Sequence, residues 1–208
     1  MEGARNHFYN LEDRMQLDKN PFTQFEDWYQ YARTCDEADI DAMTLATATS
    51  DGKPSARIVL YKGISRGGFL IFTNYESRKA IEMLANPYAA LVIYWPRSYR
   101  QIRIEGHIET ISPVESQQYF QTRARGSQIA SSISEQSREI PNRDYLLKKY
   151  AEFEKKHSEK EIACPSVWGG FRIIPTLFEF WQGQQHRLHD RFCYRKQGEG
   201  WQIVRLAP

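Results

Sequence analysis

The residues best suited to chemistry in this chain lie near its C-terminus, within residues 177–191, LFEFWQGQQHRLHDR. Side chains of an extended strand alternate between two faces, so Arg187, His189 and Arg191 would share one face. Three neighbouring cations repel one another unless an anion lies among them. The segment fits a solvated polar edge strand, and it equally fits a site for a phosphorylated ligand, with His189 able to exchange protons near neutral pH.

A second group of cations stands at an expected helix start. Ser77 can cap a helix that runs to about Asn86, which places Arg78 and Lys79 in the first turn. Cations at that end oppose the helix dipole, whereas a bound anion would be contacted by both cations and by free backbone N–H groups. Taken alone, these residues are most simply two exposed surface cations.

A third candidate region follows a capping box at Ser112 and Glu115, which predicts a helix start. Tyr119 and Arg123 are four residues apart and would share one face of that helix. Residues 123–137, RARGSQIASSISEQS, are small and polar, a composition that suits a loop or short helix lining a polar ligand better than a core.

Short apolar runs separated by turn signals predict a β-rich fold. Helices are expected over 21–32, 77–86, 113–123 and 142–157, and strands over 42–49, 55–62, 69–73, 88–95, 101–108, 171–174, 192–196 and 201–206. Pro175 is expected to interrupt its strand. Hairpin turns such as SDGKP favour an antiparallel barrel or sandwich with peripheral helices, and spacing alone does not choose between the two.

Composition bounds the class of protein. The 208 residues carry 28 basic and 26 acidic side chains, and this near balance argues against a nucleic-acid-binding protein. Three widely spaced cysteines form no metal pattern and suggest a reducing, cytoplasmic setting. No apolar run reaches membrane-span length, and no signal peptide is evident. We expect a mobile N-terminal arm over residues 1–20 and a single domain over residues 21–208.

Several motifs together resemble the pyridoxine/pyridoxamine 5′-phosphate oxidase family. They are RIVLYK (57–62), FTNYESRK (72–79), RQIRIEG (100–106), RARGSQ (123–128), SEQS (134–137), WGGFR (168–172), FWQG followed by RLHDR (180–191) and the terminal RLAP. The resemblance implies an FMN-binding split barrel and a homodimer with two FMN sites at the subunit interface. It also implies oxidation of pyridoxine or pyridoxamine 5′-phosphate to pyridoxal 5′-phosphate, with molecular oxygen reduced to hydrogen peroxide and ammonia released from the amine.

The resemblance also implies residue roles. FMN would be held by Arg57, Ile58, Val59, Leu60, Tyr61, Lys62, Phe72, Thr73, Arg78, Lys79, Gln101, Gln136, Ser137, Trp181 and Arg191. Substrate would be bound by Lys62, Tyr119, Arg123, Ser127, Arg187, Leu188 and His189, its phosphate lying among the first four. Arg187 would clamp the substrate ring and His189 would hydrogen-bond the substrate, with proton transfer a further role. Because flavin carries the redox step, no metal is expected.

One departure from the family concerns the N-terminus. Family members commonly begin with an arginine-rich segment whose tyrosine closes over the substrate, and here Arg5, Tyr9 and Arg14 stand in another arrangement. Two alternatives therefore stay open: a split-barrel flavin reductase with another electron donor, and a non-catalytic pyridoxal phosphate-binding protein. The sequence does not settle substrate preference, turnover rate, the role of the arm or the presence of a second, regulatory site.

Overall fold

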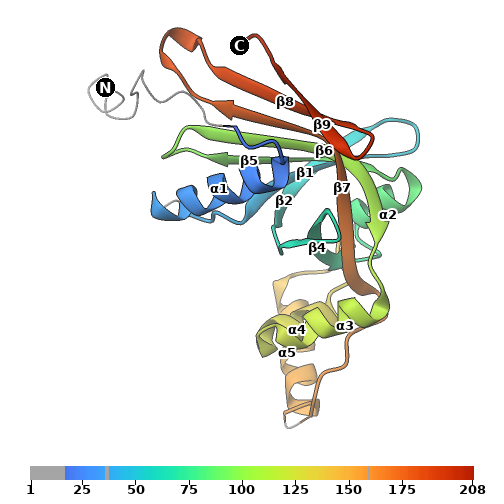
Figure 1. Cartoon of the computed structure of the whole chain (residues 1–208). Coiled ribbons are helices and arrows are strands. Elements are labelled where there is room, and N and C mark those ends of the chain that lie inside the picture. Colours follow the sequence, from blue (N-terminus) through green and yellow to red (C-terminus); the bar gives the residue numbers. More distant parts are fainter. Residues whose placement is uncertain (1–16, 36–37, 159) are drawn as a thin grey trace.

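The computed structural model describes residues 17–35, 38–158 and 160–208. A nine-stranded sheet dominates this part of the chain, with helices around it (Figure 1). The elements in order are α1 (Pro21–Thr34), β1 (Ala42–Ala48), β2 (Pro54–Leu60), β3 (Ile64–Ser65), β4 (Gly68–Asn74), α2 (Arg78–Ala85), β5 (Tyr88–Trp95), β6 (Arg100–Thr110), α3 (Pro113–Thr122), α4 (Arg125–Ile133), α5 (Arg143–Lys156), β7 (Trp168–Gln182), a 3₁₀ turn (Gln185–Arg187), β8 (Asp190–Gln197) and β9 (Gly200–Arg205).

The sheet is organised around β7. The strand order is β2-β1-β5-β6-β7-β4-β3, with β8 on β7 and β9 on β8, and every described pairing is antiparallel. Strand β6 follows β7 along its length, whereas β4 pairs with residues 168–173 and β8 with residues 177–182. The expectation of a mainly β, antiparallel fold with peripheral helices is confirmed.

Helix α1 closes the apolar interior of the sheet. Phe25, Trp28 and Ala32, at helical spacing, are buried against the aromatic residues Phe69 and Phe180. Asn20 begins the helix, since its side chain accepts a hydrogen bond from the backbone N–H of Phe22 at 3.0 Å. Burial of each large side chain contributes roughly 1.5–3 kcal/mol, so this helix fixes the surrounding strands firmly.

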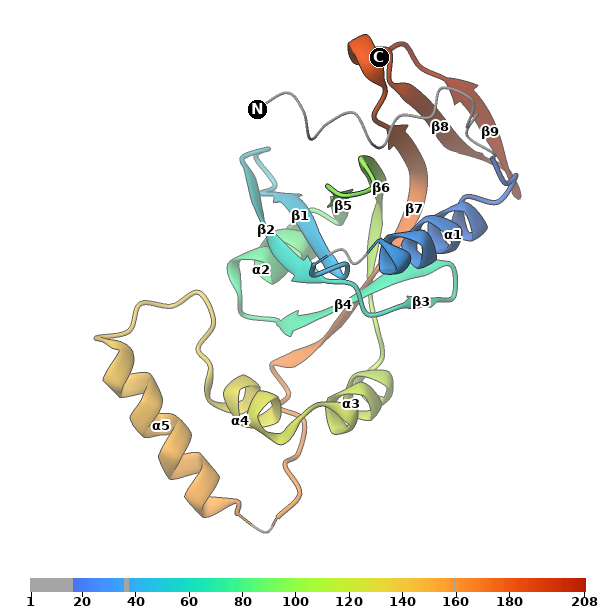
Figure 2. The same ribbon diagram turned by 90° about the vertical axis from the view of Figure 1, so that its left-hand side faces the viewer.

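Helices α3, α4 and α5 form a separate layer at the N-terminal end of β7, opposite the β8–β9 hairpin (Figures 1 and 2). The predicted capping box is present: the N–H of Glu115 donates to Ser112 Oγ at 3.1 Å, and the N–H of Ser112 donates to Glu115 Oε2 at 3.2 Å. A small core of Phe120, Ile129 and Trp168 joins this layer to β7. The layer therefore places side chains of residues 119–136 beside the N-terminal end of β7.

Three local expectations were wrong. Strand β7 continues through Pro175, because a bulge opposite Glu105 and Gly106 shifts the register where proline cannot donate to the ladder. Arg123 lies just beyond α3, as its C-cap residue, and has extended rather than helical backbone angles. Ser77 is the N-cap residue of α2, so the predicted helix start is confirmed, but the expected capping hydrogen bond from its side chain is absent.

The expected N-terminal arm falls largely on residues 1–16, which lie outside the described residues. At its end, Leu17 packs against the core and the backbone carbonyl of Asp18 accepts a hydrogen bond from Tyr194 Oη at 2.8 Å. Residues 17–20 are thus attached to the domain.

Candidate functional site

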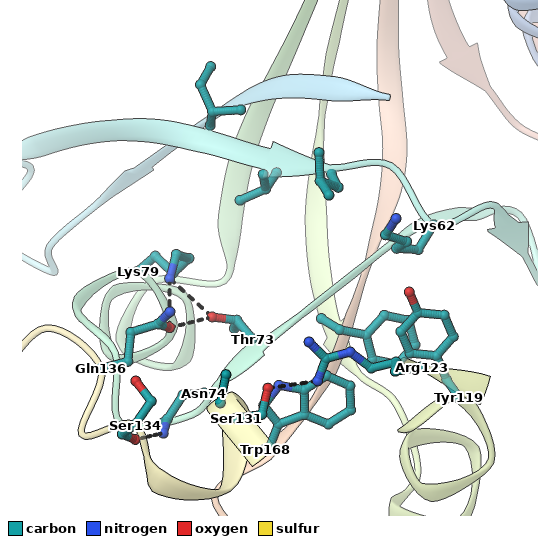
Figure 3. A pocket seen from close by; sticks show the side chains of 15 residues that line it. Lys62, Thr73, Asn74, Lys79, Tyr119, Arg123, Ser131, Ser134, Gln136 and Trp168 are labelled. Carbon is teal, nitrogen blue, oxygen red and sulfur yellow. Dashed lines mark hydrogen bonds between the residues drawn. The ribbon is translucent and has the colours of Figure 1, made fainter. Parts of the chain in front are cut away.

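A cavity of about 370 Å³ lies between strands β2 and β4 and the helical layer (Figure 3). Its lining mixes apolar side chains with amides, hydroxyls and cations. The lining residues are Ile58, Val59, Leu60, Lys62, Phe72, Thr73, Asn74, Lys79, Tyr119, Arg123, Ala130, Ser131, Ser134, Gln136 and Trp168. A cavity of this size and character suits a drug-sized polar ligand.

Lys79 marks one end of this cavity. Its Nζ donates to Thr73 Oγ1 at 3.0 Å and to Gln136 Oε1 at 3.1 Å (Figure 3). It also donates to Ser77 Oγ at 3.3 Å. Burial, with a smaller effect from the Arg57 charge, lowers the pKa of Lys79. These three partners are neutral oxygens, so the half-buried cation is solvated by dipoles and favours an anion beside it.

Arg123 marks the other end. Its guanidinium lies 4.7 Å from the centroid of the Trp168 ring, and its Nη1 donates to Ser131 Oγ at 2.7 Å. The rings of Phe72 and Tyr119 stack beside it with centroids 3.8 Å apart. Burial lowers the pKa of Arg123. The aromatic faces therefore hold a partly dehydrated cation in one orientation, as a site for an anionic group requires.

A buried carboxylate lies behind the Lys79 end. Glu82 accepts hydrogen bonds from Thr47 Oγ1 and Ser55 Oγ at 2.5 Å, and from Arg78 Nε at 2.9 Å. Its Oε2 also lies 3.3 Å from Arg57 Nη2. Burial alone would raise the pKa of Glu82, but these hydrogen bonds outweigh burial and bring the pKa to about 2. Glu82 thus stays anionic and restrains both arginines.

A second group of predicted residues gathers at the C-terminal end of β7. Trp181 pairs with Gln101 on β6 and with Arg191 on β8. Arg191 Nη2 lies 2.9 Å from Glu179 Oε1, and this hydrogen-bonded pair raises the pKa of Arg191. Glu179 is only 5% exposed, so Arg191 is held by a buried anion.

The turn after β7 carries Arg187 and His189. His186 and Arg187 both have left-handed backbone angles, with φ of 56° and 62°, a conformation that costs an L-residue roughly 1–2 kcal/mol. Arg187 is therefore on a tight turn and not on the strand that its alternation with Arg191 suggested. Gln184 stabilises the turn: its Nε2 donates to Asp190 Oδ2 at 3.0 Å and its backbone N–H to His189 Nδ1 at 3.0 Å.

The structure brings ten of the predicted residues to the cavity and leaves others outside it. Arg57 and Arg78 are bound to Glu82, Tyr61 packs in the aromatic core, and Ser137 Oγ accepts from the backbone N–H of Arg78. Ser127 is exposed and does not line the cavity, whereas Ser131, one turn later on α4, does. Sequence reasoning missed Asn74, Ala130, Ser131, Ser134 and Trp168, although the small polar run 123–137 and the WGGFR motif contain four of them.

The cavity and the second group lie at opposite ends of one strand. Thr73 pairs with Gly169, while Gln101 and Arg191 pair with Trp181. These two β7 positions are twelve residues apart, which is roughly 40 Å in a fully extended strand. Within one protomer the two groups therefore do not form a single site.

Over residues 17–35, 38–158 and 160–208, no group of three or more His, Cys, Asp or Glu is placed to hold a metal ion. Within the same ranges, no helix is both long and apolar enough to cross a membrane.

Known proteins resemble this chain over nearly its whole length. Residues 35–157 match the family described as pyridoxamine 5′-phosphate oxidase, and residues 168–208 match the pyridoxine 5′-phosphate oxidase C-terminal dimerisation region. A pyridoxine/pyridoxamine 5′-phosphate oxidase of Coxiella burnetii is 56% identical over 94% of this chain and 99% of that protein. One from Cupriavidus taiwanensis is 50% identical over 91% of this chain and 89% of that protein.

Solved structures agree with this match. PhzG from Burkholderia lata, solved in complex with tetrahydrophenazine-1-carboxylic acid, has a TM-score of 0.89 and 29% identity, covering 94% of this chain and 98% of its own. A pyridoxamine 5′-phosphate oxidase-related, FMN-binding protein from Nostoc punctiforme has a TM-score of 0.74 at 15% identity, covering 93% of this chain and all of its own. The fold is thus the FMN-binding split barrel expected from the sequence.

Proposed function

The chain belongs to the pyridoxine/pyridoxamine 5′-phosphate oxidase family, with FMN as cofactor and a homodimer as its assembly, and from this we propose its full reaction. Pyridoxine 5′-phosphate and molecular oxygen would give pyridoxal 5′-phosphate and hydrogen peroxide. Pyridoxamine 5′-phosphate, oxygen and water would give the same two products and ammonia. The observation that carries this proposal is a cavity with a cation at each end, Lys79 and Arg123, each suited to a phosphate group.

The Lys79 end would hold the FMN phosphate. Lys79 already lies among Thr73 Oγ1, Ser77 Oγ and Gln136 Oε1, and a phosphate would give this half-buried ammonium the anionic partner that these neutral oxygens lack. Bound FMN supplies the two-electron acceptor for the reaction. The apolar side chains of Ile58 and Leu60, which also line the cavity, suit the flat ring of a flavin.

The Arg123 end would hold the substrate phosphate. Arg123 presents a planar guanidinium that matches phosphate geometry, and its stacking on Trp168 reduces the entropy lost on binding. Lys62 and the Tyr119 hydroxyl line the same cavity and can complete the cage. Ser131, which accepts a hydrogen bond from Arg123, would act in the place first expected of Ser127.

A second subunit would bring Arg187 and His189 to this cavity. The two groups lie at opposite ends of β7 within one protomer, so a partner's C-terminal region is the simplest source of the missing half. Ile58 is 62% exposed and Leu60 is 49% exposed on β2, beside the cavity, which favours coverage by a partner. The match of residues 168–208 to a dimerisation region also supports this arrangement.

The residues of the turn would orient the substrate. Arg187 would hold the substrate ring by charge and by stacking, so that the reacting carbon faces the acceptor. Leu188, 69% exposed at the tip of the turn, would cover the ring and exclude water. His189 would hydrogen-bond a polar substituent of the ring. Gln101, Trp181 and Arg191 would contact the cofactor from the same side.

The proposal is tested by oxygen uptake. FMN-loaded protein is given pyridoxine 5′-phosphate, and oxygen consumption and pyridoxal 5′-phosphate formation are followed together. We expect one oxygen per product, and hydrogen peroxide in the same ratio. An Arg187→Ala variant should still bind FMN but turn over poorly, and undiminished turnover would remove the role assigned to Arg187.

Two other outcomes correspond to the alternatives. Reduction of bound flavin by a nicotinamide donor, but not by pyridoxine 5′-phosphate, would identify a split-barrel flavin reductase. Stoichiometric binding of pyridoxal 5′-phosphate without oxygen uptake from either substrate would identify a binding protein. The phosphate cage at Arg123 fits both phosphorylated vitamers and therefore favours the oxidase over the reductase.

A further inference from the structure

One hydrogen bond defines the protonation pattern of His189. The backbone N–H of Gln184 donates to His189 Nδ1 at 3.0 Å. A backbone N–H can only donate, so Nδ1 must offer a lone pair to accept this bond. In the neutral imidazole one ring nitrogen carries the proton and the other does not. The proton of neutral His189 therefore resides on Nε2.

The surrounding turn holds the ring in this arrangement. Gln184, whose N–H makes the bond, is itself attached through its side chain to Asp190 at 3.0 Å. The Leu188 N–H donates to the Gln185 carbonyl at 3.0 Å and closes the turn between them. On its other side the imidazole lies against Trp181, with ring centroids 4.6 Å apart. Nδ1 is thus directed at the turn, which leaves Nε2 as the nitrogen available to a ligand.

We propose that His189 serves the reaction as a hydrogen-bond donor through Nε2–H and not as a general base. The proposal rests on the proposed function for the identity of the substrate, and it deepens the role of one residue of that site. Nε2 already holds a proton and cannot take another, while a proton arriving at Nδ1 would displace the Gln184 N–H. The group recognised by His189 is accordingly an acceptor on the substrate ring, such as a phenolic oxygen.

The tautomer is measured directly by nitrogen NMR on FMN-loaded protein labelled at histidine with ¹⁵N. The spectrum is recorded at a pH above which the ring signals of His189 no longer change. We expect a bonded proton on Nε2 and none on Nδ1. The signals of His189 are assigned by their loss in His189→Gln, and His186→Gln, altered at an exposed histidine in the same turn, is the matched control. A proton on Nδ1, or a mixture of both tautomers, would overturn the proposal.

Kinetics of two substitutions test the chemical role. Glutamine at position 189 retains an N–H donor near the place of Nε2, whereas glutamate supplies a carboxylate that can accept a proton but not donate a hydrogen bond. If His189 were a general base, its loss in His189→Gln would lower the rate by roughly 10²–10⁴-fold. If His189 is a hydrogen-bond donor, His189→Gln keeps a donor and kcat/KM should stay within about tenfold of wild type. His189→Glu should lose on the order of a hundredfold or more. The reverse order would identify a base.

These measurements separate two kinds of failure. Should the wild-type protein oxidise neither substrate, the proposed function fails while the NMR spectrum still decides the tautomer of His189. Should it oxidise substrate with a proton on Nδ1, the proposed function stands and the donor role is wrong. The NMR experiment needs no variant for its main result, so poor folding of His189→Glu does not affect it.

Discussion

Glu82 offers the most quantitative test of the charges behind the cavity. Its carboxylate is only 4% exposed, and hydrogen bonds from Ser55, Thr47 and Arg78 bring its pKa from 4.5 to about 2. A shift of this size corresponds to roughly 3 kcal/mol of folding free energy. Arg78 is 65% exposed, and water screens its part, so we expect Glu82→Gln to lower the free energy of unfolding by about 2 kcal/mol at neutral pH.

The stability difference between wild type and Glu82→Gln should depend on pH in a defined direction. A carboxylate with a depressed folded-state pKa stabilises the protein above its unfolded pKa, and this stabilisation is lost as pH falls through the folded pKa. The difference between wild type and Glu82→Gln should therefore be full above about pH 5 and nearly absent at about pH 2. This difference is measured by urea unfolding of the FMN-free proteins. Both are kept at one protomer concentration, because the stability of a dimer depends on concentration.

Glu152→Gln is the matched control, because Glu152 forms an exposed ion pair with Lys148 on α5, in which Lys148 Nζ lies 3.9 Å from Glu152 Oε1. That pair should contribute at most about 0.5 kcal/mol. An equal loss of stability for Glu82→Gln at neutral and at strongly acidic pH would show that packing, and not charge, is what Glu82 contributes. Unchanged stability at neutral pH would refute the network itself.

Three further predictions concern the cavity and the sheet. Lys79→Met should weaken FMN binding by roughly tenfold to a hundredfold, but leave riboflavin binding, measured by flavin fluorescence, nearly unchanged, since only FMN has the phosphate. Trp168→Leu should raise KM for pyridoxine 5′-phosphate by about tenfold with a smaller effect on kcat, because Arg123 loses the ring on which it lies. Gly106→Ala should lower the free energy of unfolding by roughly 3 kcal/mol or more, because the added Cβ would lie 2.1 Å from the Ile174 carbonyl oxygen. Gly200→Ala is the control: its added Cβ would have its nearest contact at 3.8 Å, so it should change the free energy of unfolding by less than about 1 kcal/mol. Thermal unfolding compares the two variants.

Local signals in the sequence predicted most of the sheet and the helices. The capping box at Ser112, the helix that begins at Pro21 and the SDGKP hairpin depend on neighbouring residues, and each is present. The strand alternation in 101–108 likewise follows from one buried face, with Ile102 and Ile104 fully buried. These features need no information about distant parts of the chain, which is why spacing alone identifies them.

The wrong predictions arise where residues distant in the sequence determine the local structure. Pro175 lies within a continuous strand because Gly106, nearly seventy residues earlier, has no side chain to collide with the bulged backbone. Alternation of Arg187, His189 and Arg191 predicted a strand, whereas His186 and Arg187 adopt left-handed angles that sequence propensity disfavours. Hydrogen bonds from Gln184 to His189 and Asp190 hold that turn. Such strain is found where precise placement of side chains matters, here at the residues assigned to the substrate.

The residues of the candidate site stand in recognisable motifs, but their positions in space depend on contacts between distant parts of the chain. The motif FTNYESRK begins on β4, which pairs with the N-terminal part of β7, whereas FWQG and RLHDR lie at the C-terminal end of β7 and just beyond it. Their side chains therefore lie at different ends of the protomer. With the proposed roles, the phosphate-binding cations and the ring-binding residues of one protomer lie a strand's length apart, so a complete site would need its second half from another copy. Dimerisation in this family would then be a requirement of the chemistry, and the stiffness of a 15-residue strand would set the spacing of the two halves.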